Sequence, residues 1–398
     1  MGDMYWPLMK DCITKEDKKA MSDFILNAGR FTNGPRVKQF EKEWSEWLGV
    51  KRSLFVSSGS TANFLLLSAI KEHYGLKDGD KVLVPSVTWV TNIGPVIQLG
   101  LTPVFCDVDT NTFSFDKNYM KQLSLLHDDI KAVFVSHLFG VPAEVEEYKK
   151  ILPDAVFIED VCESHGAKCK TGMAGTLSEG STFSFYFGHH ITTVEGGMVS
   201  TNNEELYQLM RAKRSHGMAR ECDPEYFKEY VEKYPDVHPM FMFITDGYNF
   251  RNSELYAVLG TEQLKRLTDQ NNQREVNYKR FREIISKYPD LIKSNLISEG
   301  TSSFCLQFIC SSEEKKKILE KELQKRGIET RPLCSGNLLR QPFLRNNNEI
   351  GDSPEHHPNA EYLHTHGFFI GNNHLITDED FVQFEKDLES AVNEVYQW

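Results

Sequence analysis

Short apolar segments alternate with longer amphipathic segments along the first half of the chain. Five mainly apolar runs, separated by stretches long enough for helices, lie at 53–56, 81–84, 103–106, 132–135 and 156–158. Runs that are apolar on both faces and spaced by helices are typical of a mostly parallel sheet. Two more strands are expected at 182–186 and 198–201, followed by a helix at about 203–214. The pattern therefore predicts an α/β domain.

Helices are expected before this sheet, and the periodicity weakens after it. One amphipathic helix is expected at 15–28, and a second carries Phe40, Trp44 and Trp47 on one side. Between residues 222 and 246 the periodicity is weak, which indicates an insertion or a connecting loop.

The last third of the chain predicts a smaller unit. A long helical period begins near Ser253 and extends to about Lys287. Further elements are expected as strands at 305–310 and 368–370 and as helices at 313–326 and 378–395. We therefore expect a large α/β domain over 1–250, with the N-terminal helices, and a connecting helix with a small α+β domain over 251–398.

Charge and hydropathy exclude two classes of partner. The chain has 45 Lys and Arg against 57 Asp and Glu, a net charge of −12, so it lacks the basic character of a nucleic-acid binder. No run approaches the roughly 18 uninterrupted apolar residues that a membrane helix requires, and the N-terminus is too charged for a signal peptide. We expect a cytoplasmic protein that binds neither nucleic acid nor membranes.

The eight cysteines are scattered. They form no C-x-C or C-x-x-C pair, and they lie at Cys12, Cys106, Cys162, Cys169, Cys222, Cys305, Cys310 and Cys334. Such dispersal fits reduced thiols better than disulfides, a zinc site or an iron–sulfur cluster, so no metal is expected.

A small-residue stretch after the first core strand has two interpretations. Residues 57–63 (SSGSTAN) follow a strand and open a helix, where free N–H groups and the helix dipole favour an anion. The same residues could equally be a helix cap with a glycine turn.

Two other strand ends carry candidate site residues. Asp160 ends a strand in the sequence FIEDVCESH, and acids at the carboxyl ends of parallel strands line the crevice where ligands bind. The alternative is a loop with helix-capping acids. Trp89 also follows a strand, where an indole either fills the core or lies against a planar ligand.

The stretch 183–198 (FSFYFGHHITTVEGGM) is the most informative. Together with the strand-end residues above and with 247–251 (GYNFR), it resembles the DegT/DnrJ/EryC1/StrS sugar aminotransferases, which are pyridoxal phosphate enzymes of fold type I. The resemblance extends from residues 31–35 (FTNGP) to 331–333 (RPL) and 367–371 (GFFIG).

One position departs from the family pattern. The family has its cofactor-binding lysine five residues after the position of Ser184 and six before that of Glu195, and both counts lead to His189. An imidazole cannot bind the cofactor covalently as lysine does, but it can act as a base near neutral pH. The pair His189 and His190 resembles the 3-dehydratase branch of the family.

The resemblance implies roles for the cofactor site. Gly59, Ser60 and Ser184 would hold the phosphate of pyridoxal or pyridoxamine phosphate, Trp89 would stack on its ring, and Asp160 would pair with the ring nitrogen. That last contact keeps the ring an electron sink. The cofactor would not be covalently bound.

The resemblance also implies a catalytic base, a partner subunit and substrate contacts. His189 would be the base, Asn249 would reach the phosphate from the neighbouring subunit of a homodimer, and His216 and Arg331 are candidates for substrate binding. A capped helix end and an ordinary surface guanidinium are the competing explanations for those last two residues.

The implied reaction removes the C3 hydroxyl of a nucleotide-linked 4-keto-6-deoxy sugar, with GDP-4-keto-6-deoxymannose as the expected substrate. Glutamate would donate the amine, ammonia would be released, and the pathway would be dideoxysugar biosynthesis. Three alternatives remain: a nucleotide-sugar 4-aminotransferase, an iron–sulfur-dependent CDP-sugar 3-dehydrase, and a catalytically silent cofactor-binding protein.

Overall fold

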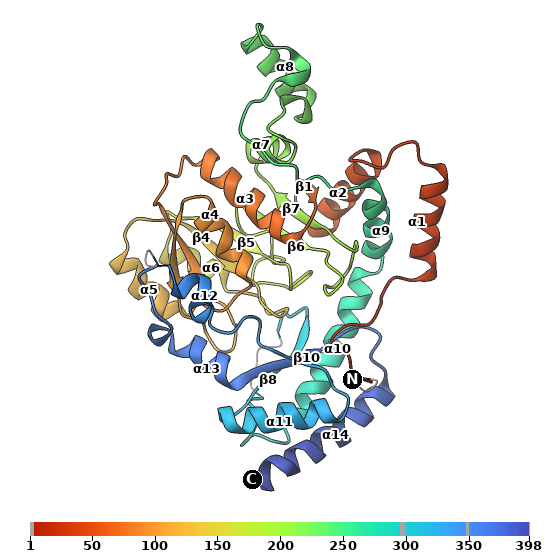
Figure 1. Ribbon diagram of the computed structural model, residues 1–398, viewed down its shortest axis with the longest axis vertical. Coiled ribbons are helices and arrows are strands. Elements are labelled where there is room, and N and C mark those ends of the chain that lie inside the picture. Colours follow the sequence, from red (N-terminus) through yellow and green to blue (C-terminus); the bar gives the residue numbers. More distant parts are fainter. Residues whose placement is uncertain (1–3, 295–298, 348–349, 398) are drawn as a thin grey trace.

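A seven-stranded mixed sheet forms the centre of the molecule (Figure 1). The structure is a computed structural model and describes residues 4–294, 299–347 and 350–397. The strand order is β1-β7-β6-β5-β4-β2-β3, and β7 is antiparallel to both of its neighbours while the other pairings are parallel. The strands are β1 (Arg52–Val56), β2 (Lys81–Pro85), β3 (Thr102–Cys106), β4 (Ile130–Ser136), β5 (Val156–Asp160), β6 (Gly180–Ser184) and β7 (Gly197–Thr201). The predicted α/β class with a mostly parallel sheet is confirmed.

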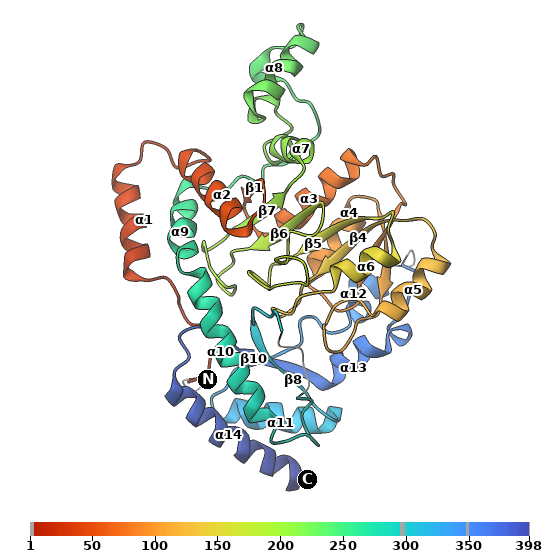
Figure 2. The same ribbon diagram turned by 180° about the vertical axis from the view of Figure 1, so that it is seen from behind.

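Helices cover both faces of this sheet, as the views from front and back show (Figure 2). Leu54 and Val56 of β1 pack into one buried apolar cluster with α3, whereas Phe55 between them packs with α2. One face is covered by α3 (Gly59–His73), α4 (Gly94–Gln98) and α7 (Glu204–Arg214). The other is covered by α2 (Pro35–Leu48), α5 (Lys117–Leu126), α6 (Val145–Ile151) and α9 (Glu254–Leu264).

Local sequence signals set where the first helices begin and end. Thr14 caps α1 (Lys15–Asn27) in a reciprocal capping box with Asp17. Pro35 occupies the first turn of α2, and Gly49 ends that helix at φ +82°, a conformation that costs glycine little. Ser58 caps α3 and accepts a hydrogen bond from the N–H of Thr61.

The segment predicted to be irregular contains a helix. Residues 222–243, which we term the arm, include α8 (Pro224–Lys233) and project from the body beyond α7 (Figure 1). None of the residues of α8 is buried by the described part of the chain. Phe227, Tyr230 and Val231 do recur at helical spacing, so the prediction of a loop overlooked a helical signal.

The long helix predicted from 253 to 287 is two helices. The chain turns at Lys265 and Arg266, between α9 and α10 (Leu267–Ile285). This turn lets two side chains reach the buried carboxylate of Asp17: Arg266 forms an ion pair with it at 2.7 Å, and Gln263 donates a hydrogen bond at 2.8 Å. The prediction failed because Asp17 lies about 250 residues away in the sequence.

A second, three-stranded antiparallel sheet lies near the C-terminus, as the predicted α+β unit requires. Its order is β8-β10-β9, and its apolar cluster includes Trp6, Phe281, Phe308 and Phe368. The elements are β8 (Cys305–Ile309), α11 (Glu313–Lys325), β9 (Thr330–Pro332), α12 (Pro342–Arg345), α13 (Pro358–His366), β10 (Gly367–Gly371) and α14 (Asp378–Gln397). The predicted division at residues 250 and 251 stays a prediction. Across the described part of the chain, no helix combines the length and apolarity needed to cross a membrane.

Candidate functional site

Four of the predicted site segments lie at one edge of the large sheet. The strands β1, β2, β5 and β6 run in the same direction, so their carboxyl ends meet there. These ends carry Gly59, Trp89, Asp160 and Ser184, and the loop after β6 carries His189. We call these five residues the sheet-edge site.

The start of α3 lies directly against the end of β6. A Cβ atom added to Gly59 would lie 2.6 Å from Cβ of Ser184 and 3.2 Å from Sγ of Cys162, so only glycine allows this approach. The N–H groups of Gly59 and of the exposed Ser60 open the helix and have no helical carbonyl to bind. This corner therefore offers backbone donors and a serine hydroxyl to an anion, as a phosphate requires.

Asp160 is held in a fixed orientation. Its Oδ2 accepts a hydrogen bond from Nδ2 of Asn63 at 2.8 Å, and its Oδ1 accepts one from the backbone N–H of Cys162 at 2.9 Å. The side chain is almost fully buried at the end of β5. An oriented carboxylate of this kind suits a protonated ring nitrogen.

The loop that carries Trp89 is joined indirectly to Asp160 by a hydrogen bond of Thr91, two residues after the tryptophan. Nδ2 of Asn63, which binds Asp160, also donates to Oγ1 of Thr91 at 3.2 Å. The indole itself is 54% exposed, although it follows a buried strand. The core interpretation of Trp89 is therefore wrong, and the aromatic face is available to a planar ligand.

His189 is a partly exposed imidazole that lies among other aromatic rings. Its ring lies 5.5 Å from that of Phe304, and its Nδ1 is buried with no hydrogen-bond partner among the described residues. Burial and then the guanidinium of Arg274 lower the pKa of His189 to about 4. At neutral pH the ring is therefore uncharged and has a lone pair that can accept a proton.

His190 has a different environment although it is adjacent. It is 1% exposed, and its Nε2 donates a hydrogen bond to the carbonyl oxygen of Ser302 at 2.9 Å. Its ring packs 5.0 Å from that of His165, which is also fully buried. His190 thus joins the loop after β6 to the segment before β8.

Sequence reasoning missed Glu163, which lies near Asp160. One of its carboxylate oxygens accepts a hydrogen bond from the N–H of Phe139 at 3.0 Å. Burial, opposed by that hydrogen bond and assisted by Asp160, raises the pKa of Glu163 to about 7. Its position three residues after Asp160 in FIEDVCESH was the available signal.

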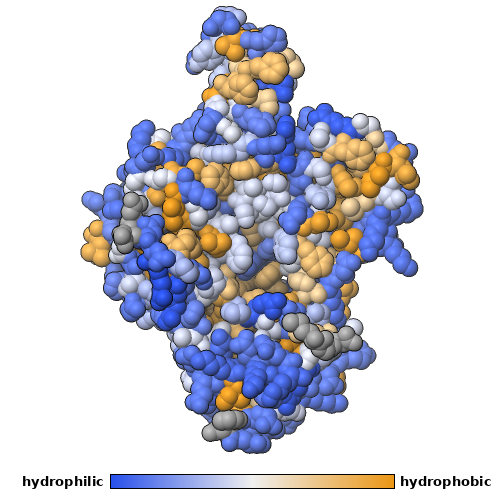
Figure 3. All heavy atoms as spheres, viewed as in Figure 1, coloured by the Kyte–Doolittle hydropathy of each residue, from blue (hydrophilic) through white to orange (hydrophobic). Residues whose placement is uncertain are grey.

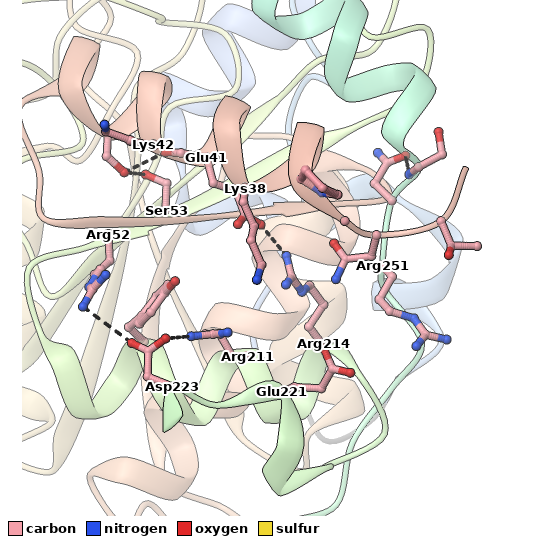
Figure 4. A pocket seen from close by; sticks show the side chains of 18 of the residues that line it. Lys38, Glu41, Lys42, Arg52, Ser53, Arg211, Arg214, Glu221, Asp223 and Arg251 are labelled. Carbon is pink, nitrogen blue, oxygen red and sulfur yellow. Dashed lines mark hydrogen bonds and ion pairs between the residues drawn. The ribbon is translucent and has the colours of Figure 1, made fainter. Parts of the chain in front are cut away.

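Asn249 does not lie with these residues but lines a separate cavity of about 1290 Å³ (Figure 4). We call it the basic cavity, because nine Lys and Arg side chains but only four Asp and Glu line it. Arg211 and Arg52 both pair with Asp223, and Arg214 pairs with Glu41. Arg251 donates a hydrogen bond to Oδ1 of Asn249, and both side chains are open to the cavity.

The two weaker candidates are not brought to the sheet-edge site by any contact of their own. His216 is exposed at φ +64°, and its N–H donates to the carbonyl of Tyr248 at 2.7 Å. Arg331 is exposed in the middle of β9 and pairs with Glu329 at 2.9 Å. Among the described residues, no group of three His, Cys, Asp or Glu side chains is placed to bind a metal.

The fold and the sheet-edge site together define a class: α/β enzymes whose ligand site lies at the carboxyl edge of the sheet and accepts a planar, anionic group. The family model described as the DegT/DnrJ/EryC1/StrS aminotransferase family matches residues 11–386. The chain belongs to this family, and the resemblance inferred from the sequence is confirmed.

Individual relatives agree with this assignment. GDP-4-keto-6-deoxy-D-mannose 3-dehydratase of Yersinia pseudotuberculosis is 36% identical over 363 residues, which cover 89% of this chain and 91% of that protein. The structure of Escherichia coli GDP-4-keto-6-deoxy-D-mannose-3-dehydratase with bound hydrated PLP is similar at a TM-score of 0.86 and 31% identity, covering 97% of this chain and 100% of that one. A structure of GDP-4-keto-6-deoxymannose-3-dehydratase with a trapped PLP-glutamate geminal diamine is similar at a TM-score of 0.84 and 32% identity, covering 96% and 100%.

Proposed function

We propose that this chain is a pyridoxal-phosphate-dependent 3-dehydratase that removes the C3 hydroxyl of GDP-4-keto-6-deoxymannose, with glutamate as amino donor and release of ammonia. The observation that carries the proposal is the uncharged imidazole of His189 at the position where the family has a lysine. The similarity to proteins named as GDP-4-keto-6-deoxymannose 3-dehydratases supports the choice of substrate.

The sheet-edge site fits the cofactor. Ser184, Ser60 and the N–H groups at the start of α3 would hold the phosphate, since glycine at position 59 leaves room for close approach. Trp89 would cover the ring, and Asp160 would pair with its protonated nitrogen. When bound, the cofactor supplies an amine for the 4-keto carbon and a ring that delocalises an electron pair.

His189 provides the proton transfer. As an uncharged imidazole it would accept a proton from the methylene carbon of the bound cofactor, on the ring nitrogen that carries no hydrogen. The imidazolium so formed can give that proton to the C3 oxygen, which then departs as water. Because burial lowers the pKa of His189, the protonated form is a good acid and the base is readily restored.

We also propose that the enzyme is a homodimer in which Asn249 serves the partner's site. Asn249, which is exposed, and Arg251, which is partly exposed, line the basic cavity rather than the sheet-edge site of their own chain. The arm also carries large side chains that this chain leaves exposed, namely Tyr234, Val237, Met240, Phe241 and Phe243. Figure 3 shows orange surface on this projecting part of the molecule. Such a patch is typical of a protein interface.

The alternatives are less consistent with the site. A 4-aminotransferase of this family needs the lysine that His189 replaces, and an iron–sulfur enzyme needs clustered cysteines, whereas these are dispersed. A silent binding protein would not need the uncharged imidazole of His189 in addition to the oriented carboxylate of Asp160.

Product analysis tests the proposal. The purified protein is incubated with pyridoxal phosphate, glutamate and GDP-4-keto-6-deoxymannose, and ammonia and the sugar product are measured. We expect stoichiometric ammonia and a sugar that has lost the C3 oxygen. A stable 4-amino sugar as the main product would instead establish the aminotransferase.

A further inference from the structure

Arg274 is a cation in the interior of the protein. It lies on α10, is 2% exposed, and its Nη1 donates to the backbone carbonyls of Asn372 and Phe304. Among the residues that the structure describes, no carboxylate lies within ion-pair distance of its guanidinium, and its Nε has no hydrogen-bond partner. Burial lowers the pKa of Arg274 to about 10, so the side chain is still charged at neutral pH.

The neighbouring acid does not neutralise this charge. Glu275 uses one carboxylate oxygen to accept from the hydroxyl of Thr301 and the other to accept from the N–H of Ser303. A buried guanidinium without a carboxylate is costly, and such a cost is often associated with a functional role. The question is therefore which group the charge of Arg274 acts on.

Arg274 acts electrostatically on a cluster of imidazoles. His189 and His190 follow β6, and His165 follows β5, with its ring 6.2 Å from His189 and 5.0 Å from His190. The charge of Arg274 disfavours protonation of all three rings. The phenol ring of Tyr186 lies 6.4 Å from the imidazole of His189, and the backbone of Cys162 raises the pKa of His189. Among the described residues, no carboxylate acts on the pKa of His189 to offset the charge of Arg274.

Arg274 also supports the ring on which His189 packs. Its Nη1 reaches the carbonyl oxygen of Phe304 at 3.4 Å, and the ring of Phe304 lies 5.5 Å from the imidazole at an angle of 33°. The carbonyl of Ser302, two residues before Phe304, accepts the hydrogen bond from His190. The segment before β8 is thus held by α10 on one side and contacts both histidines on the other.

We propose that Arg274 is a positioning residue for His189: it anchors the Phe304 backbone whose ring packs on the imidazole, and it places a buried positive charge near that imidazole. The consequence is a base that stays uncharged between turnovers. This inference rests on the base role proposed for His189.

Titration of His189 tests the charge without using activity. In the cofactor-free protein labelled with 13C-histidine, the His189 resonance is identified by its absence from His189→Asn, and its pKa is measured by NMR. We expect Arg274→Gln to raise the pKa of His189 by roughly one unit, a tenfold change in proton affinity. Arg274→Lys, which keeps the charge, should leave the value close to that of the wild type.

Two further variants keep the test decisive. Arg280→Gln removes a cation from the same helix that is already paired with Asp378, and we expect no change in the pKa of His189. Phe304→Leu leaves Arg274 in place, so kcat should fall with little change in the pKa of His189. If the Arg274 variants do not fold, Phe304→Leu tests the positioning role in their place. A normal kcat in Phe304→Leu would then overturn that role.

The results separate this inference from the proposed function. An unchanged pKa of His189 in Arg274→Gln would overturn the inference even if His189 is the base. Conversely, full turnover by His189→Asn would overturn the base role, while the effect of Arg274 on the pKa would remain measurable.

Discussion

The sheet-edge site and the basic cavity differ in how their polar groups are satisfied. At the sheet edge, Asp160 accepts hydrogen bonds from Asn63 and Cys162, and His189 packs on Phe304, all within one chain. In the basic cavity, cations outnumber acids by nine to four. The first region is arranged in advance of ligand binding, whereas the second lacks the negative charge that would balance it.

The cations of the basic cavity fall into two groups. Arg52, Arg211 and Arg214 are held by acids, and the pair between Arg214 and Glu41 is buried. Lys38 and Arg251 form no ion pair with any described residue, and Figure 4 shows both side chains at the open space. Under the proposed homodimer, the functional site would consist of a half that is preformed within one chain and a half that a second subunit completes.

Among the changes to the sheet-edge site, removal of the proposed base His189 should have the largest effect on turnover. In His189→Asn we expect turnover to fall by roughly 10²–10⁴, the usual contribution of a positioned general base. Cofactor binding should persist, because the phosphate, ring and nitrogen contacts come from other residues. Steady-state kinetics and cofactor absorbance measure the two effects.

His190→Asn is the matched control. It removes a buried hydrogen bond to Ser302, so thermal stability should fall while a substantial part of the turnover remains. Loss of turnover in His190→Asn, with near-normal turnover in His189→Asn, would show that the base is the neighbouring histidine.

A lysine at position 189 should change how the cofactor is held. In His189→Lys the amine can bond to the cofactor aldehyde, so borohydride reduction should fix one cofactor per chain, detected by intact mass. The wild-type protein should gain no mass under the same treatment. A covalent cofactor in the reduced wild-type protein would contradict the assignment of His189 as the residue that replaces the lysine.

Subunit exchange tests whether Asn249 in the basic cavity contributes to the site of the partner subunit. Asn249→Ala and His189→Asn are each expected to be poorly active, but a mixed dimer would contain one site with both native residues. After equal mixing we expect about a quarter of wild-type activity, since half of the dimers are mixed and each has one intact site. No recovery, with exchange demonstrated by mass-tagged subunits, would place Asn249 in its own chain's site.

The smallest expected effect concerns Glu163 and pH. Burial raises the pKa of Glu163 from 4.5 to about 7, so between these values the folded protein holds a proton that the unfolded chain has lost. Its contribution to stability is therefore present below about pH 4.5 and is lost as the pH rises through about 7. Glu163→Gln has no titrating group at this position, so its free energy of unfolding should fall by about 1–2 kcal/mol less than that of the wild type as the pH rises. This range allows for the partial exposure of the carboxyl.

Urea unfolding of the cofactor-free protein at pH 5 and pH 8 measures this difference. Glu205→Gln, at an exposed position on α7, is the control and should behave as the wild type. Equal pH dependence in Glu163→Gln and in the wild type would show that Glu163 does not titrate in this range.

The parts of the site that could be predicted are those encoded locally. Apolar runs marked the strands, so residues directly after them, such as Asp160 and Trp89, were expected at one edge. His189 emerged by counting from Ser184 and Glu195 against the family pattern.

What escaped prediction depends on contacts between distant residues. At the break between α9 and α10, Arg266 pairs with the distant Asp17, and the environment of His189 depends on Arg274 and Phe304, more than 80 residues later in the chain. Neither contact leaves a periodic signal in the sequence. The exposure of Trp89 likewise follows from the packing of its neighbours rather than from its own residue type.

The arm has a consequence for the lifetime of the protein. No residue of α8 is buried, and Phe241 and Phe243 are 66% and 58% exposed, so little within the chain opposes local unfolding of this segment. A protease that cuts after aromatic residues should therefore cleave a dilute sample first in residues 222–243. If a second subunit covers the arm, cleavage should slow as the protein concentration rises, and newly made chains would be vulnerable until they find a partner.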